Sequence, residues 1–144
     1  WNKGVKQGIK LLNENNYYVF IITNQSGVGR GYFTEKQVIK LHSWINDQLK
    51  QEGAHIDCFY YSTYFKFSKI KSHKKDKYLR KPNTGMIQLA KKSWPINFKG
   101  SFLIGDKNTD IMVAKKMGIK GYLVNKNYNF LRLIRKILNS KRMK

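Results

Sequence analysis

The chain has almost no cysteine and few acidic residues. Cys58 is the one cysteine among 144 residues, which excludes an internal disulfide framework and a cysteine-rich zinc module. No apolar run approaches the roughly 18 residues that a membrane-spanning helix needs. No basic segment followed by an apolar one opens the chain, as it would in a secretory signal. We therefore expect a cytoplasmic protein that has no membrane partner.

The shortage of acids leaves a large positive charge. The chain has 29 Lys and Arg against 8 Asp and Glu, a formal net charge of +21, and 41% hydrophobic residues. The apolar share suffices for the core of one domain and argues against disorder. A basic surface favours phosphate-bearing partners, including nucleic acid. The lysines are spread along the chain, however, and the densest stretch, Lys66 to Lys81, falls in an expected loop. The positive charge alone therefore favours lysines that simply lie on the solvent-exposed surface over a dedicated binding site for nucleic acid.

Hydrophobic periodicity predicts helices that alternate with strands. The expected helices span 4–15, 34–52, 84–92, 109–117 and 130–139, and the expected strands span 18–22, 56–61, 101–104 and 122–124. Thr34 and Gln37 form a capping-box pattern at the start of the helix. The apolar residues expected to form its buried face are Val38, Leu41, Ile45 and Leu49. Alternation of this kind is typical of a parallel sheet covered by helices. The expected fold class is α/β, with one domain over residues 1–144 and a long basic loop over residues 62–83.

Polar segments follow two of the expected strands and precede the helix at 84–92. They are Thr23–Gly27, Gly105–Asp110 and Arg80–Gly85. In open α/β sheets, ligands bind beyond the carboxyl ends of the strands. Hydroxyl groups, cations and the two carboxylates of Asp106 and Asp110 would there suit a phosphate and a hard divalent cation such as Mg²⁺.

Simpler interpretations of these residues stay open. Asp106 and Asp110 could be a turn residue and a helix N-terminal acid, and Thr23 with Asn24 could form a plain turn. The three histidines, His42, His55 and His73, lie in no metal-binding or catalytic pattern. Cys58 is expected to be a small core residue.

The three segments, taken in order, closely resemble motifs II, III and IV of the haloacid dehalogenase (HAD) superfamily. They read Thr23-Asn24-Gln25-Ser26-Gly27-Val28-Gly29-Arg30-Gly31, Arg80-Lys81-Pro82-Asn83-Thr84-Gly85-Met86 and Gly105-Asp106-Lys107-Asn108-Thr109-Asp110. The subgroup they resemble is D-glycero-D-manno-heptose 1,7-bisphosphate phosphatase, with its relative histidinol-phosphatase. The resemblance runs from about residue 4 to residue 125 and implies a Rossmann-like three-layer sandwich with a mainly parallel sheet.

The resemblance also implies an activity and a set of site residues. The activity is Mg²⁺-dependent hydrolysis of a small sugar phosphate, with D-glycero-D-manno-heptose 1,7-bisphosphate as the expected substrate. Thr23 and Lys81 would act on the phosphoryl group, Asp106 would bind Mg²⁺, and Asp110 would support the site. The implied substrate-binding residues are Asn24, Gln25, Ser26, Arg30, Arg80 and Lys107.

Two features depart from the family pattern. The family opens with a strand that ends in Asp-x-Asp-x-Thr and carries the nucleophile, and the 144 residues contain no such motif. We therefore expect a domain that is incomplete at its N-terminus and lacks the central strand, and an isolated chain that is inactive, marginally stable and prone to associate. Many of the heptose phosphatases also carry a Cys/His zinc loop. Here the matching positions are Ser62-Thr63-Tyr64 and Lys77-Tyr78-Leu79, so we expect no zinc.

Two other functions stay open. The phosphatase domain of polynucleotide kinase-phosphatases also resembles the Thr-Asn-Gln-x-Gly and Arg-Lys-Pro-x-x-Gly-Met patterns, and the +21 charge fits a 3′-phosphorylated nucleic acid end. The absence of an Asp-x-Asp motif would also fit a non-catalytic relic of a phosphatase.

Overall fold

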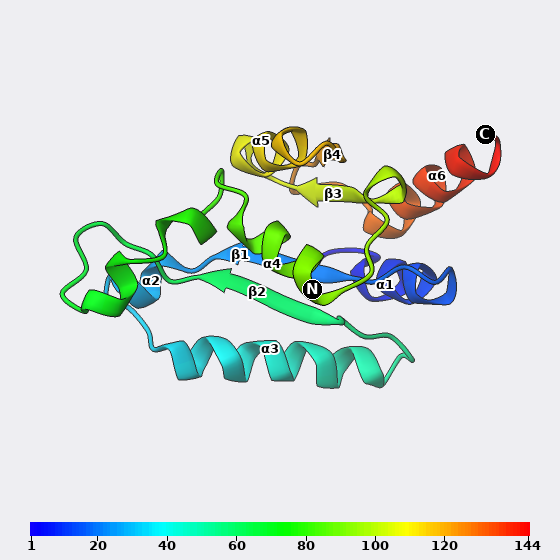
Figure 1. Cartoon of the computed structure of the whole chain (residues 1–144). Coiled ribbons are helices and arrows are strands. Elements are labelled where there is room, and N and C mark those ends of the chain that lie inside the picture. The colour runs from blue at the N-terminus through cyan, green and yellow to red at the C-terminus, as the bar shows by residue number, and fades with distance from the viewer.

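The computed structural model describes residues 1–144 and has an α/β fold (Figure 1). The helices are α1 (Val5–Glu14), α2 (Ser26–Gly29), α3 (Glu35–Lys50), α4 (Gly85–Ser93), α5 (Asn108–Lys116) and α6 (Phe130–Arg142). The strands are β1 (Phe20–Asn24), β2 (Cys58–Ser62), β3 (Phe102–Gly105) and β4 (Lys120–Leu123). Three single turns of 3₁₀ helix are η1 (Lys71–Lys74), η2 (Lys77–Leu79) and η3 (Phe98–Gly100). None of the helices has the length and apolar character needed to cross a lipid bilayer.

The four strands form two separate parallel pairs. β1 pairs with β2, with Phe20 opposite Cys58, and β3 pairs with β4, with Phe102 opposite Lys120. No ladder joins β1 to β3. The parallel pairing confirms the predicted fold class. The division into two sheets is the arrangement expected when no central strand joins the pairs.

Helices cover these strands and build three small cores. The cores are Ile9, Leu49, Ala54 and Ile56; Ile87, Leu103, Val113 and Ala114; and Leu12, Ile134 and Leu138. In Figure 1, α3 lies below the β1–β2 pair and α5 lies above β3. Successive residues of β1 alternate between the cores, because Ile21 packs against the first and Ile22 against the second. This alternation is what a strand with helices on both faces requires.

Helix α3 confirms its predicted N-terminus and corrects its predicted buried face. The Gln37 backbone N–H donates to Thr34 Oγ1 at 3.2 Å and the Thr34 N–H donates to Gln37 Oε1 at 2.8 Å, so the capping box is present. Leu41, predicted to be buried, is 49% exposed. The inward stripe instead includes His42, whose ring stacks on Phe59 with centroids 4.3 Å apart. Position 42 follows position 38 by one helical turn, whereas position 41 is rotated toward solvent.

The segment after β1 also differs from the prediction. Thr23 and Asn24, expected in a loop, are the last two residues of the strand. Ser26 to Gly29 form the short helix α2. The first polar residues are therefore held by the sheet rather than by a free loop, which fixes the direction of their side chains.

Candidate active site

The Lys81 ammonium group joins three parts of the fold. Its Nζ donates to Asp110 Oδ1 at 2.6 Å and to the backbone carbonyl of Ile22 at 3.2 Å. The Lys81 and Asp110 side chains are only 13% and 6% exposed. The end of β1, the segment before α4 and the first turn of α5 therefore meet at one cation. An ammonium group has three N–H donors, so one donor stays available to a ligand.

Asn24 holds the backbone of Lys81 in place. Its Oδ1 accepts from the Lys81 N–H at 2.9 Å, and its Nδ2 donates to the Lys81 carbonyl at 3.2 Å. One side-chain amide thus satisfies both backbone groups of the residue that bears the ammonium. The predicted contact of Asn24 with substrate stays a prediction, since its amide is engaged in positioning Lys81.

Asp110 has two structural roles at once. Its Oδ1 binds Lys81, and its Oδ2 accepts from the backbone N–H of Lys107 at 3.1 Å, which closes the start of α5. The carboxylate packs directly on the end of β3, where a Cβ at Gly105 would lie 2.3 Å from Asp110 atoms. The two interpretations of Asp110, a helix N-terminal acid and a supporting site acid, are therefore compatible. Glycine at position 105 makes that packing sterically feasible.

Asp106 lies at the surface, and its carboxylate is in no ion pair. Tyr128 is near it. Burial, and secondarily the negative charge of Asp106, raises the pKa of the Tyr128 phenol above its usual value. The sequence pattern did not point to Tyr128, because its segment lies between an expected strand and an expected helix and carries no motif.

The residues present fit part of a magnesium site. No three His, Cys, Asp or Glu side chains gather closely enough to hold a metal ion by themselves. Mg²⁺, however, keeps several waters and is commonly bound by one or two carboxylates plus phosphate oxygens. The free oxygens of Asp106 suit one of these positions, whereas Asp110 is occupied by Lys81.

The other predicted site residues have different surroundings. The Gln25 amide donates to the Thr23 hydroxyl at 3.2 Å, so these two side chains meet. Ser26 begins α2. The Arg30 guanidinium is exposed and lies 4.1 Å from the centroid of the Phe65 ring, on the long loop. Arg30 is thus directed at the loop rather than at Lys81.

Two further cations of the predicted set keep free donors. Nη1 of Arg80 is buried without a hydrogen-bond partner, which leaves a desolvated donor next to Lys81 in the chain. Buried donors of this kind are normally satisfied, so a ligand oxygen would be a favourable partner. Both backbone groups of Lys107 bond to Asp110, whereas its side chain is exposed and in no ion pair.

Comparisons with known proteins agree with this fold. The family model for polynucleotide kinase 3 phosphatase matches residues 1–128. A D-glycero-beta-D-manno-heptose-1,7-bisphosphate 7-phosphatase of Rhodopseudomonas palustris is 42% identical over 122 residues, which are 85% of this chain and 68% of that protein. A D-glycero-alpha-D-manno-heptose-1,7-bisphosphate 7-phosphatase of Photorhabdus laumondii is 39% identical over 112 residues, 78% of this chain and 61% of that protein.

A solved structure shares the fold at lower identity. D,D-heptose 1,7-bisphosphate phosphatase from B. bronchiseptica, complexed with magnesium and phosphate, aligns with a TM-score of 0.79 at 20% identity and covers 95% of this chain and 83% of its own. A HAD-like phosphatase from Mesorhizobium loti aligns with a TM-score of 0.81 at 24% identity, covering 95% of this chain and 73% of its own.

The chain has the α/β fold of these two phosphatase structures. The family model over residues 1–128 and the relatives at 42% and 39% identity show that the chain belongs to the HAD phosphatases, in the family described as polynucleotide kinase 3 phosphatase. The family resemblance predicted from the three motifs is thereby confirmed.

Proposed function

We propose that this chain is the greater part of a Mg²⁺-dependent phosphatase that hydrolyses a small sugar phosphate, with D-glycero-D-manno-heptose 1,7-bisphosphate as substrate. The observation that carries the proposal is the Lys81 ammonium, fixed between the end of β1 and Asp110 with one donor free. The Rhodopseudomonas palustris and Photorhabdus laumondii relatives, named as heptose-bisphosphate phosphatases, support the choice of substrate.

Each residue has a defined task in this proposal. Lys81 and the Thr23 hydroxyl bind the equatorial oxygens of the transferring phosphoryl group, because that group needs cationic and hydroxyl donors. Asp106 supplies an oxygen ligand for Mg²⁺, which would neutralise charge on the phosphate. The unpartnered Nη1 of Arg80 donates to substrate. Residues 1–144 contain no Asp-x-Asp motif, so the proposal assigns the attacking carboxylate to none of these residues.

Phosphate release from the heptose bisphosphate tests the proposal. The assay uses the product of the gene, including any residues encoded before Trp1, with and without Mg²⁺. We expect turnover that requires Mg²⁺ and is lost in Asp106→Asn. Asp76→Asn, which alters an acid of the exposed loop, is the matched control and should keep the full rate. Undiminished turnover in excess chelator, or in Asp106→Asn, would overturn the assignment.

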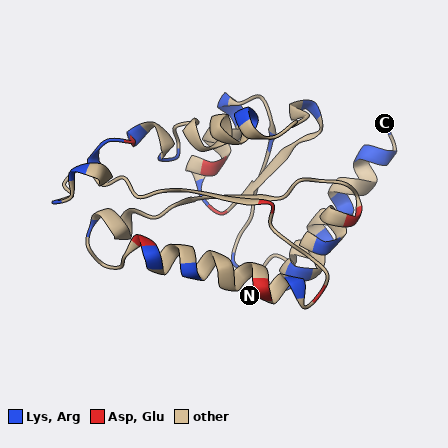
Figure 2. Ribbon diagram, turned by 60° about the horizontal axis from the view of Figure 1, so that its bottom comes forward, with Lys and Arg blue, Asp and Glu red and all other residues tan.

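A polynucleotide 3′-phosphatase is the second candidate, and the long loop between β2 and α4 favours it. Six lysines of the loop before Lys81 carry no ion pair, and the loop exposes two aromatic rings, with Phe67 73% and Tyr78 55% exposed. The lysines are Lys66, Lys69, Lys71, Lys74, Lys75 and Lys77. Figure 2 shows Lys and Arg on most elements, with few acids between them. Exposed rings and lysines together suit single-stranded nucleic acid.

A comparison of turnover with the two substrates distinguishes the two candidate functions. Turnover of a 3′-phosphorylated oligonucleotide that exceeds turnover of the heptose bisphosphate, and falls steeply with salt, would favour the polynucleotide. A complete gene product that hydrolyses neither substrate would favour the non-catalytic relic.

A further inference from the structure

Helix α3 exposes large apolar side chains to solvent. Leu41 and Trp44 are each 49% exposed, and residues three positions apart are neighbours on a helix surface. The Trp1 ring, itself 53% exposed, adjoins the Trp44 ring, with centroids 6.3 Å apart. Single exposed apolar residues are normal on a protein surface, whereas adjoining ones form a patch of the kind that contacts another molecule.

Two opposite charges flank this patch along α3. Lys40 precedes Trp44 by four positions and Asp47 follows it by three, so the three residues lie along one side of the helix. Both charged residues are exposed, and neither forms an ion pair. The outer face of α3 is the set Lys40, Leu41, Trp44 and Asp47.

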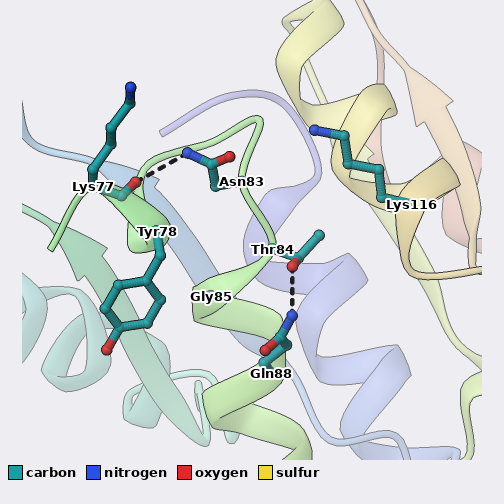
Figure 3. A pocket seen from close by; sticks show the side chains of 7 residues that line it. All are labelled: Lys77, Tyr78, Asn83, Thr84, Gly85, Gln88 and Lys116. Carbon is teal, nitrogen blue, oxygen red and sulfur yellow. Dashed lines mark hydrogen bonds between the residues drawn. The ribbon is translucent and has the colours of Figure 1, made fainter.

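The positive charge is distributed unevenly along the chain. Residues 1–57 contain 7 Lys and Arg and 5 Asp and Glu, whereas residues 58–144 contain 22 and 3. The pocket between η2, α4 and α5 (Figure 3) belongs to the second part, and Lys77 and Lys116 line it without any acid. In Figure 2, α3 runs along the bottom and carries both blue and red bands. Two copies of this chain repel each other least where the charge is nearly balanced, which is the part that contains α3.

The outer face of α3 is complementary to a second copy of itself. Positions 40 and 47 are equally distant from a level between residues 43 and 44. Two α3 helices that pack antiparallel about a two-fold axis at that level therefore place Lys40 of each copy opposite Asp47 of the other. The two Trp44 side chains then lie next to each other at the centre. Because a two-fold contact repeats every interaction, it contains two such ion pairs.

We propose that the outer face of α3 is a dimerisation surface, on which a second copy of this chain packs with its α3 antiparallel to the first. The apolar side chains supply the attraction, and the exposed ion pairs, which are individually weak, fix the register. An anionic partner such as a lipid surface would instead be attracted to residues 58–144, where most of the charge lies. None of the four residues belongs to the candidate active site, so the dimer is independent of the proposed function.

Sedimentation velocity of the gene product, including any residues encoded before Trp1, measures the dimer. We expect the sedimentation coefficient to shift from that of a monomer to that of a dimer between about 1 and 100 μM protein. Raising the salt concentration from about 0.05 to 0.3 M should strengthen the dimer, because salt screens the repulsion between two positively charged molecules. Association through bound nucleic acid would weaken with salt instead.

Charge reversal tests the antiparallel register. Lys40→Asp alone, or Asp47→Lys alone, sets like charges opposite each other twice in each dimer, and either should raise the Kd about tenfold. The double variant restores both pairs with reversed signs and should bind within about threefold of the wild type. A general effect of net charge would act in opposite directions in the two single variants, since one lowers the charge and the other raises it.

A matched pair of apolar variants tests the face itself. Leu41→Ser should raise the Kd at least about tenfold, as loss of a central interface residue does. Ile39→Ser is the control, because Ile39 is 54% exposed on the same helix but lies about 160° around its axis from Leu41. It should change the Kd less than about twofold. Circular dichroism checks that each variant is folded.

Three results would overturn the dimer. One is a gene product that stays monomeric over the whole concentration range, which would leave the outer face of α3 to another segment of that product or to a different protein. The second is a double charge reversal that dimerises no better than the single ones. The third is an equal effect of Leu41→Ser and Ile39→Ser.

Discussion

Removing the ammonium group of Lys81 should destabilise the fold as well as the site. Lys81 and Asp110 are 13% and 6% exposed and their charged atoms lie 2.6 Å apart. In Lys81→Met, the buried carboxylate would keep only the Lys107 N–H as a donor. Breaking a buried ion pair from one side typically costs about 3–5 kcal/mol, and the residual exposure places this case near the lower end. We therefore expect a loss of about 3 kcal/mol in the free energy of unfolding.

A double-mutant cycle tests this reasoning. Asp110→Asn keeps an acceptor for Lys107 and should cost about 2 kcal/mol, whereas the double variant should cost about 3 kcal/mol, because the two losses share one interaction. Urea unfolding followed by circular dichroism supplies the values, with an osmolyte added equally to all variants if one is unfolded in buffer. Lys6→Met, which breaks the more exposed pair with Glu52, is the control and should cost under about 1 kcal/mol. If the losses of the single variants were additive, with a coupling below about 0.5 kcal/mol, the stabilising interaction between Lys81 and Asp110 would be refuted.

Three further predictions follow from single residues. Burial lowers the pKa of His42 below its usual value, so the unfolded chain takes up a proton that the folded chain resists, and stability should be complete above about pH 6.5 and decline as the pH falls below it. His42→Phe should reduce that decline between pH 7.5 and 5.5 in urea unfolding, and an unchanged decline would contradict the assignment. Gly105→Ala should displace Asp110, because the new Cβ would lie 2.3 Å from its side chain; we expect a stability loss of about 2 kcal/mol, whereas Gly31→Ala, where nothing lies within 4 Å of the Cβ, should show only the strain of its positive φ. Finally, a protein of only these 144 residues should release no phosphate from heptose 1,7-bisphosphate in the presence of Mg²⁺. Turnover above that of an Asp106→Asn variant would show that these residues do contain a nucleophile.

Local patterns predicted the helices and strands because each depends on neighbours in the sequence. The capping box of Thr34 and Gln37 formed as expected, and α1 and α6 lie within a few residues of their predicted bounds. The buried face of α3 was less predictable. Leu41 and His42 are adjacent, and hydrophobicity favours burial of leucine. The flat stacking of His42 on Phe59 is a contact between separate elements that no periodicity reveals.

The site was predictable in its members but not in its contacts. The motif segments named Lys81 and Asp110, whereas their ion pair joins residues 29 positions apart. The binding of Asn24 to both backbone groups of Lys81 spans 57 positions. Tyr128 lies outside every motif and is near Asp106 only because β4 and the segment after it return to the end of β3. Pairing between distant segments depends on tertiary packing, which a single sequence does not display.

The contacts of Lys81 also explain how one site can form on two separate sheets. Its ammonium binds the carbonyl of Ile22 in β1 and the carboxylate of Asp110 on α5, the helix packed against β3 and β4. The Ile22 side chain crosses the same boundary to contact the core of Leu103 and Val113. Because no strand ladder joins β1 to β3, these contacts include much of what connects the two halves near the site. A phosphate bound by the third donor of Lys81 would therefore lie at the junction of the sheets, where its binding energy stabilises both the reactive geometry and the fold.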